Sequence, residues 1–343
     1  MKKRFPYQYK NGPVTVTIEK DGTKTRTWDD EKYGMEPELE FPESIDYKCT
    51  NFCDLGCLWC HEKSTTNGQH ADLHKFADML ERSNWPAGIE MAVGGGNPLA
   101  HPFIDDFLEF CDGKEWLVNM TVNWKHLMSD QKHHHLVDLT YKEYVFHCFE
   151  MGYIQGLGIS ISPKEAIEHI EDLAEVCVKS KNNVVLHFIE GIHSYTDVTI
   201  VLKAMSNYIL LKNLPITSKL LILGKKDFGR YSLMSEGLKA VMDSKSEEWK
   251  REIDNFLKLV TKYGGIVSFD NLAIERLGVL KNLPEEFVKT HYMGSEGTHT
   301  MYIDGVKEEY AINSTATTRF PIGDKTIREV FKDIYNKRKE LQK

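Results

Sequence analysis

Four of the seven cysteines of this 343-residue chain lie in one short stretch, from Cys49 to Cys60. Three of them, Cys53, Cys57 and Cys60, have the spacing C-x3-C-x2-C, which brings three thiolates onto one tight loop. Such a loop can surround a single metal centre. An iron–sulfur cube contains four irons, and each iron requires a ligand from outside the cube. Three closely spaced cysteines would leave one iron open to a ligand that is not protein.

Zinc is the alternative metal for this loop. Structural zinc sites are closed and tetrahedral, and their ligands usually come as two pairs that are far apart in sequence. No second pair exists here, because Cys111, Cys148 and Cys177 are isolated and have the spacing of core residues in helices. Cys49 or His61 could still complete a compact zinc site, so a non-catalytic zinc-binding protein is an alternative hypothesis. Disulfides are not expected in a chain that is long enough to bury a core.

A second motif follows the cysteines. Residues 89–99 read I-E-M-A-V-G-G-G-N-P-L, in which an apolar strand leads into Gly94, Gly95 and Gly96 and then a proline. Glycines at a strand end allow the backbone to approach a ligand closely. Any tight turn after a strand can use glycine, so this motif alone is weak. Its position one strand–helix unit after the cysteine loop makes the combination far more specific.

The two motifs together resemble those of the radical S-adenosylmethionine (SAM) enzyme superfamily. Its members have C-x3-C-x-aromatic-C, and Trp59 occupies the aromatic position. They also have a G-G-E-P-L type motif, which Gly95, Gly96 and Pro98 match, with Asn97 where the family usually has Glu. The resemblance covers residues 40–230. It implies that the three motif cysteines hold one 4Fe-4S cluster and that SAM binds the open iron.

The resemblance also implies which residues contact SAM. The backbone of Trp59 would lie near the adenine, and the carbonyls of the Gly94–Asn97 turn, those of Gly95 and Gly96 above all, would accept from the methionine ammonium. Asn123 stands in a partial match to a T-N-G motif, and Ser160 stands where the family often contacts the ribose or carboxylate. Asn123 could instead form a turn, and Ser160 could cap the helix that follows it. The sequence does not identify a catalytic acid, a catalytic base or a radical-quenching residue.

The expected reaction follows from the same resemblance. An external one-electron donor such as flavodoxin or ferredoxin reduces the cluster, SAM is cleaved, and a 5′-deoxyadenosyl radical abstracts hydrogen from a substrate. The last part of the chain is weakly similar to SPASM or twitch-type tails but lacks their cysteines. This similarity favours a peptide or protein side chain as the substrate. A nucleotide or other small metabolite is the alternative substrate class.

The elements that position these residues alternate between strand and helix. Repeated units of this kind predict parallel strands joined by right-handed crossovers. We therefore expect an α/β fold, a partial (β/α)6 TIM-like barrel, whose ligand site lies at the C-terminal strand ends. The expected strands are 44–48, 89–93, 117–122, 157–161, 184–189 and 219–223, and the expected helices are 71–83, 103–110, 141–150, 163–178 and 197–208. His187, in the fifth strand, is expected to be a core histidine.

Segments on both sides of this core suggest three regions. Residues 1–40 contain a β-hairpin over 14–28, turning at Asp21-Gly22, and a connector. Residues 41–230 form the barrel, and 231–343 form an α+β region that caps the substrate. This cap should contain a helix at 247–263, a strand at 266–269, a hairpin at 301–305 and a helix from Thr326. Residues 291–299 should face the substrate, and the apolar side of the last helix should dock on the barrel: Ile327, Val330, Phe331 and Ile334.

Charge and hydropathy exclude some partners. The chain has 43 basic and 51 acidic residues, and its net charge of −8 argues against a duplex nucleic acid partner. No apolar run approaches the length of a membrane helix, and the first residues lack the apolar core of a signal peptide. We therefore expect a cytoplasmic protein, in a reducing compartment that suits an oxygen-sensitive cluster.

Overall fold

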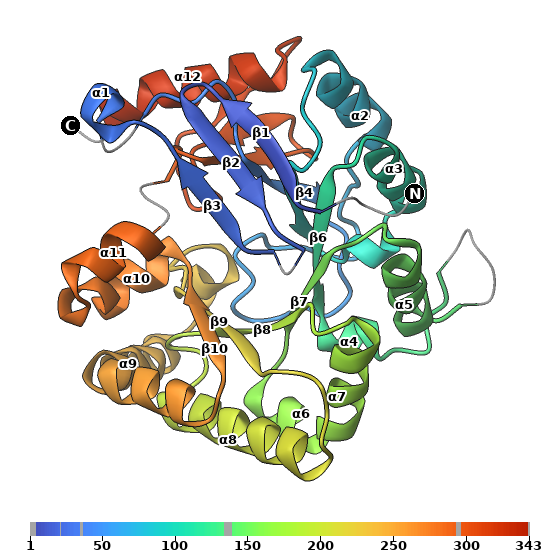
Figure 1. Cartoon of the computed structure of the whole chain (residues 1–343). Helices are drawn as coiled ribbons and strands as arrows, with labels where there is room; N and C mark the ends of the chain where they lie inside the picture. Colours follow the sequence, from blue (N-terminus) through green and yellow to red (C-terminus); the bar gives the residue numbers. More distant parts are fainter. Residues whose placement is uncertain (1–4, 21, 35–36, 134–138, 293–295, 342–343) are drawn as a thin grey trace.

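A computed structural model describes residues 5–20, 22–34, 37–133, 139–292 and 296–341. Figure 1 looks along a curved central sheet whose strands are surrounded by helices. This sheet has ten strands, in the order β10-β9-β8-β7-β6-β5-β4-β11-β12-β13. Its outermost strands are β10 and β13, so the sheet does not close, as expected of a partial barrel.

The six strands predicted from the sequence form the middle of this sheet. They lie in chain order, and each is parallel to its neighbours. Their bounds are β4 (Ser44–Thr50), β5 (Glu90–Gly95), β6 (Leu117–Asn123), β7 (Gly156–Ser160), β8 (Val184–Ile189) and β9 (Lys219–Leu223). In β6 and β7, buried residues alternate with half-buried ones, because one face packs on the helices and the other faces the barrel interior.

Helices connect these strands on the outside of the barrel. They are α2 (Leu73–Arg82), α3 (Ile104–Gly113), α4 (Trp124–Leu127), α5 (Tyr141–Met151), α6 (Pro163–Glu168), α7 (Ile170–Lys179) and α8 (Tyr195–Leu211). The single helix expected over 163–178 is wrong, because the backbone of His169 leaves the helical region and separates α6 from α7. No glycine or proline stands at this break, so the local sequence does not signal it.

The C-terminal region adds strands to both edges of the barrel sheet. β10 (Ile266–Phe269) pairs in parallel with β9, and β11 (Thr300–Asp304) pairs in parallel with β4. The expected hairpin is formed by β11 and β12 (Glu309–Ala311), and β13 (Phe320–Pro321) follows it. The tail therefore extends the barrel as well as adding helices to it.

The helices of the tail complete the outer layer. They are α9 (Glu236–Lys262), α10 (Asn271–Leu277), α11 (Glu285–His291) and α12 (Ile327–Leu341). α9 begins eleven residues before the expected start at 247, where the Ser235 side chain accepts from the Leu238 N–H. On α12, the four apolar residues predicted to dock are at most 1% exposed. The Ile327 N–H donates to Ser83 Oγ at the end of α2, which fixes α12 beside that helix (Figure 1).

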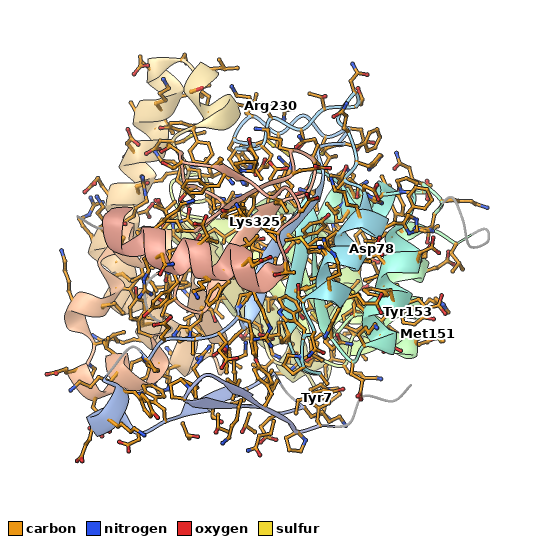
Figure 2. The ribbon with its side chains drawn as sticks, turned by 90° about the horizontal axis from the view of Figure 1, so that it is seen from above. Tyr7, Asp78, Met151, Tyr153, Arg230 and Lys325 are labelled. Atoms are coloured by element: carbon orange, nitrogen blue, oxygen red, sulfur yellow. The ribbon has the colours of Figure 1, made fainter. Side chains whose placement is uncertain are left out.

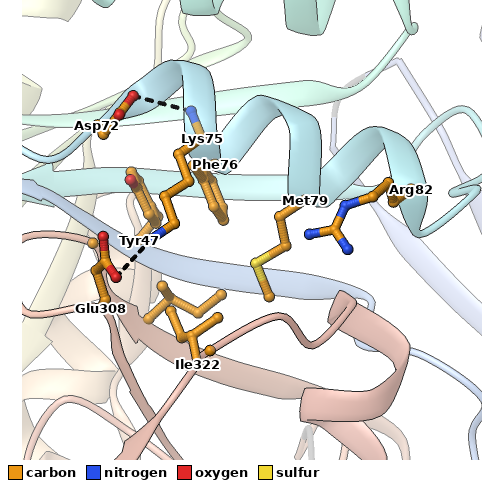
Figure 3. A pocket seen from close by; sticks show the side chains of 11 residues that line it. Tyr47, Asp72, Lys75, Phe76, Met79, Arg82, Glu308 and Ile322 are labelled. Atoms are coloured by element: carbon orange, nitrogen blue, oxygen red, sulfur yellow. Dashed lines mark hydrogen bonds and ion pairs between the residues drawn. The ribbon is translucent and has the colours of Figure 1, made fainter.

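Figure 3 shows the seam between α2 and the tail strands. The Tyr47 ring of β4 stacks on Phe76 of α2 with 3.8 Å between centroids, and a Lys75–Glu308 ion pair of 2.7 Å crosses the seam. A cavity of about 40 Å³ remains between these groups. A space of this size holds a water molecule but no cofactor, so the seam is a packing interface.

A separate three-stranded antiparallel sheet covers the end of the barrel where its strands begin. It consists of β1 (Tyr7–Asn11), β2 (Val14–Ile18) and β3 (Lys24–Thr27), followed by the short helix α1 (Asp30–Tyr33). The predicted hairpin is β2–β3, while β1 was not predicted. Arg26 of β3 forms an ion pair of 2.6 Å with Glu43, which has no solvent exposure. Burial alone would raise the pKa of Glu43, but the nearby His299 ring, 3.7 Å away, and the hydrogen-bonded Arg26 lower it to about 2.

The opposite end of the barrel is open to ligands. In Figure 2, Tyr7 of the N-terminal sheet and Arg230, just after β9, lie at opposite ends of the molecule. Among the described residues, no helix has both the length and the apolar character needed to cross a membrane.

Candidate functional site

The cysteine loop follows β4 at the C-terminal end of the barrel. Cys53, Cys57 and Cys60 are free and half-buried, and all three line a cavity of about 340 Å³. Cys111, Cys148 and Cys177 are buried, as predicted, and so is Cys49. Burial raises the pKa of Cys49 to about 12, so its sulfur stays a protonated thiol at neutral pH and is a poor ligand. The structure thus separates three accessible thiols from the buried ones.

The spacing of the sulfur atoms can be compared with that expected for zinc. Three thiolates on one zinc ion, each about 2.3 Å from the metal, would lie about 3.8 Å apart. The three loop sulfurs do not all lie within 4.8 Å of one another; among the described residues, the ligand atoms that do so belong to Cys53, Asp54 and His126. His126 Nε2 is 2.7 Å from Asp54 Oδ1 and 4.0 Å from Cys53 Sγ. In this metal-free structure the three loop sulfurs are thus not gathered as closely as three thiolates on one zinc ion would be.

The glycine turn at the end of β5 lies directly against the cysteine loop. The Gly96 N–H donates to Thr50 O at 2.8 Å, and the Asn97 N–H donates to Phe52 O at 2.7 Å. A Cβ atom on Gly96 would lie 2.1 Å from Phe52 O, and one on Gly95, whose φ is +129°, would lie 2.4 Å from Thr50 O. Only glycine permits this approach. Gly94, Gly95 and Gly96 all line the cavity.

Asn97 differs from the glycines before it. It has no solvent exposure and does not line the cavity. Neither its amide nitrogen nor its oxygen finds a hydrogen-bond partner among the described residues. Unpaired polar atoms in a protein interior are costly. Asn97 therefore lies behind the glycine turn, and its side chain does not reach the cavity in which SAM was expected to bind.

The other predicted SAM contacts lie on the same cavity wall. Trp59, Asn123 and Ser160 all line the cavity. Asn123 also caps α4, because its Oδ1 accepts from the Lys125 N–H at 3.0 Å. The helix after β7 is capped by Ser162, which leaves the Ser160 hydroxyl facing the cavity. The structure therefore brings together every predicted cofactor residue except Asn97.

His187 is not the packed core histidine that the sequence suggested. It lines the cavity, and its Nε2 lies 2.6 Å from where a Cβ on Gly158 would stand. Its surroundings lower the pKa of His187 to about 4 by desolvation, so the imidazole is neutral at pH 7. The prediction failed because β8 carries apolar residues on both sides of this position, and periodicity did not reveal which face held the cavity.

Charged residues that sequence reasoning did not identify connect the cysteine loop to the tail. Lys226, after β9, has its Nζ 3.1 Å from His61 Nε2 and donates to Ser314 Oγ at 2.9 Å. Lys48 forms ion pairs with Asp304, at 3.0 Å, and with Glu62. The sequence does place Lys48 and Lys226 at or just after the ends of predicted strands, where the ligand site was expected. Their partners are distant in the sequence and could not be assigned.

The tail also reaches the cavity from its open side. Tyr302 and Ser314 line the cavity together with Asp46 of β4. No described residue of the range 291–299, which was expected to face the substrate, lines the cavity; the carboxyl group of Glu296 lies against Asn271 and Asn313. Residues 293–295 of that range lie outside the described residues.

Comparisons with known proteins give a consistent answer on the fold. No family model and no curated protein matches the sequence. Among solved structures, SuiB of Streptococcus suis bound to S-adenosylmethionine is 12% identical and has a TM-score of 0.63, with 96% of this chain and 87% of that chain covered. SuiB bound to the precursor peptide SuiA is 13% identical and has a TM-score of 0.59, with 88% and 67% covered. The chain therefore shares the fold of SuiB.

Proposed function

We propose that this protein is a radical SAM enzyme that abstracts hydrogen from a peptide or protein side chain. The observation that carries the proposal is the meeting of the three half-buried cysteines with the strand-end glycines on one cavity. The volume of that cavity, about 340 Å³, lies within the usual range for small-molecule sites. Neither motif alone requires SAM. Together they place a metal-ligating loop beside a glycine turn whose backbone a small cofactor can approach closely.

The residues of the chain have separate tasks in this proposal. Cys53, Cys57 and Cys60 hold a 4Fe-4S cluster, which supplies the electron that breaks the C5′–S bond of SAM when an external donor such as flavodoxin or ferredoxin reduces it. The carbonyls of Gly95 and Gly96 accept from the methionine ammonium. The polar groups of Asn123 and Ser160 orient the adenosine, and the surrounding barrel restricts access of water and oxygen.

The peptide substrate is supported by the comparison with SuiB, and the position of the tail indicates where a substrate would enter. The neighbouring structure of SuiB contains a precursor peptide. In this chain, the C-terminal region places Tyr302 and Ser314 on the cavity wall, on the side where the barrel sheet remains open between β10 and β13. We infer that residues 231–343 cover the substrate at this opening. A nucleotide or other small metabolite is the competing substrate class, since it would enter by the same opening.

Anaerobic reconstitution tests the cofactor part of the proposal. The protein should take up about four irons per chain and become brown. After reduction it should convert SAM to 5′-deoxyadenosine and methionine, which chromatography separates. Stoichiometric zinc that excludes iron would support a zinc-binding protein instead, with Cys53, Asp54 and His126 as the candidate ligands. Formation of S-adenosylhomocysteine as the sole product would indicate methyl transfer and contradict the proposal.

A second assay tests the substrate class. Short peptides encoded beside this gene are added to the reduced holoprotein, and 5′-deoxyadenosine is measured against a peptide-free control. A peptide substrate should accelerate its formation and lose hydrogen, which mass spectrometry detects. Acceleration by nucleotides, with none by the peptides, would favour the small-metabolite alternative.

A further inference from the structure

The segment that follows β9 lies across the cysteine loop and contacts it through the backbone. Gly229 has a φ of +72°, and a Cβ atom at this position would lie 2.5 Å from His61 Cα and 2.6 Å from Cys60 O. Any side chain here would push the two segments apart, so glycine is required for both its conformation and its size. The ring of Phe228 packs edge-on against His61, with 6.0 Å between ring centroids.

Arg230 contributes the hydrogen bonds of this contact. Its backbone N–H donates to Cys60 O at 3.0 Å, and its Nη1 donates to Cys57 O at 2.9 Å. Its Nη2 donates to the carbonyl of Ser64, beyond the end of the motif. One residue thus holds the backbone of two motif cysteines and the exit of the loop. The planar guanidinium can make these bonds simultaneously, whereas a lysine ammonium lacks the same fork.

No carboxylate of the described residues neutralises the charge of Arg230. Among the described residues its guanidinium bonds to carbonyl oxygens and forms no ion pair. It is half-buried, so solvent screens it less than an exposed side chain. A positive charge bound to the backbone of the cysteine loop favours any additional negative charge on a group that the loop holds. The reduction potential of an iron–sulfur cluster depends on nearby charge and on hydrogen bonding in the same way.

We propose that Gly229 and Arg230 form a clasp that holds the cysteine loop in its ligating conformation, and that the Arg230 guanidinium raises the reduction potential of the bound cluster. The inference rests on the proposed function for its second part, because a potential requires a cluster. The first part concerns the metal-free chain and can be tested separately. Arg230 is a positioning residue in this role, since it acts through the cysteine loop and is not among the residues that line the cavity.

The loop conformation is tested by amide hydrogen exchange of the metal-free protein. Arg230→Gln should accelerate exchange in peptides that cover residues 51–65 and leave those from β6 to β8 unchanged. Gly229→Ala should have the same local effect, while Gly237→Ala, where a Cβ meets nothing within 4 Å, serves as its control. Unchanged exchange in the loop of both variants, or equal acceleration throughout the barrel, would overturn the clasp.

The electrostatic role is tested on the reconstituted protein. Arg230→Gln should release iron to a chelator about tenfold faster or more, as loss of groups that orient metal ligands usually does. Its cluster should also have a more negative midpoint potential in a redox titration followed by electron paramagnetic resonance. Arg230→Lys keeps the positive charge but not the two donor nitrogens of the guanidinium. Its midpoint potential should therefore be close to that of the wild type, whereas its iron release should stay faster. Arg251→Gln, an exposed arginine on α9, is the matched control.

The outcomes separate this inference from the proposed function. If the wild-type protein takes up no iron–sulfur cluster, the proposed function fails, while the hydrogen exchange of the metal-free loop still decides the clasp. If the wild type loads a cluster and Arg230→Gln keeps the wild-type potential and iron release rate, the electrostatic role is wrong and the proposed function stands.

Discussion

Gly96 offers a test of the contact between the glycine turn and the cysteine loop. A Cβ atom at this position would lie 2.1 Å from Phe52 O and 2.7 Å from Phe52 C, both backbone atoms that cannot rotate away. Gly96→Ala must therefore separate the two segments. The same movement would lengthen the hydrogen bond from the Gly96 N–H to Thr50 O, now 2.8 Å. The substitution therefore disturbs the contact between the glycine turn and the cysteine loop, while every cysteine is kept.

The expected magnitude follows from these two losses. Forcing a methyl group into a packed contact costs about 1–3 kcal/mol. Losing one backbone hydrogen bond adds about 1 kcal/mol. The free energy of unfolding should therefore fall by about 2–4 kcal/mol. Gly94→Ala is the matched control, because its Cβ would meet only Thr121 Cβ at 4.0 Å, an ordinary contact. Its unfolding free energy should stay within about 1 kcal/mol of the wild type.

Two measurements check this prediction. Urea unfolding of the metal-free proteins gives the free energies, and iron analysis after anaerobic reconstitution gives cluster loading. Gly96→Ala should lose both stability and iron, because the displaced loop no longer presents its thiolates together. Gly94→Ala should keep the wild-type iron content. If Gly96→Ala matched the wild type in both measurements, the close approach of the two motifs would be refuted.

Three further predictions concern the ligands, the N-terminal sheet and the tail. Alanine at any of the three motif cysteines should abolish iron loading, whereas Cys49→Ala should retain it; iron analysis showing the reverse pattern would overturn the ligand assignment. Glu43 has a folded-state pKa of about 2 against 4.5 for the unfolded chain, so it contributes about 3 kcal/mol of stability above pH 4.5, which is lost as the pH falls towards 2. Arg26→Met should remove most of this contribution at pH 7, and urea unfolding against pH should show its deficit shrinking below pH 4.5; a deficit that is independent of pH would contradict the assignment. Phe331→Ala should lower the unfolding free energy by about 3–5 kcal/mol, because the ring is fully buried on α12, while the exposed Lys332→Ala should change it by less than about 0.5 kcal/mol. Equal unfolding midpoints for these last two variants would contradict the docking of α12.

Local patterns in the sequence determined the barrel and the two motifs. A buried parallel strand is a short apolar run bounded by turn residues, and its identity does not depend on which strand it pairs with. The strand predicted over 184–189 has those bounds in the structure. The ligating role proposed for the cysteines could likewise be inferred, because a loop of this spacing brings its thiolates together whatever surrounds it. The glycine turn could also be recognised in the sequence. Its close approach to another segment excludes side chains, and this requirement appears as a run of glycines.

Tertiary structure alone decided which distant segments complete the site. β11 pairs with β4 across more than 250 residues, as in the Tyr302–Asp46 register, and this places the tail on the cavity. Arg230 holds Cys57 through a backbone carbonyl, a partner that every residue possesses. The face of β8 that exposes His187 depends on how the strand is rotated in the barrel. Such contacts leave no pattern in the sequence, because a backbone carbonyl has no residue type and a pairing register is fixed by packing across the whole sheet.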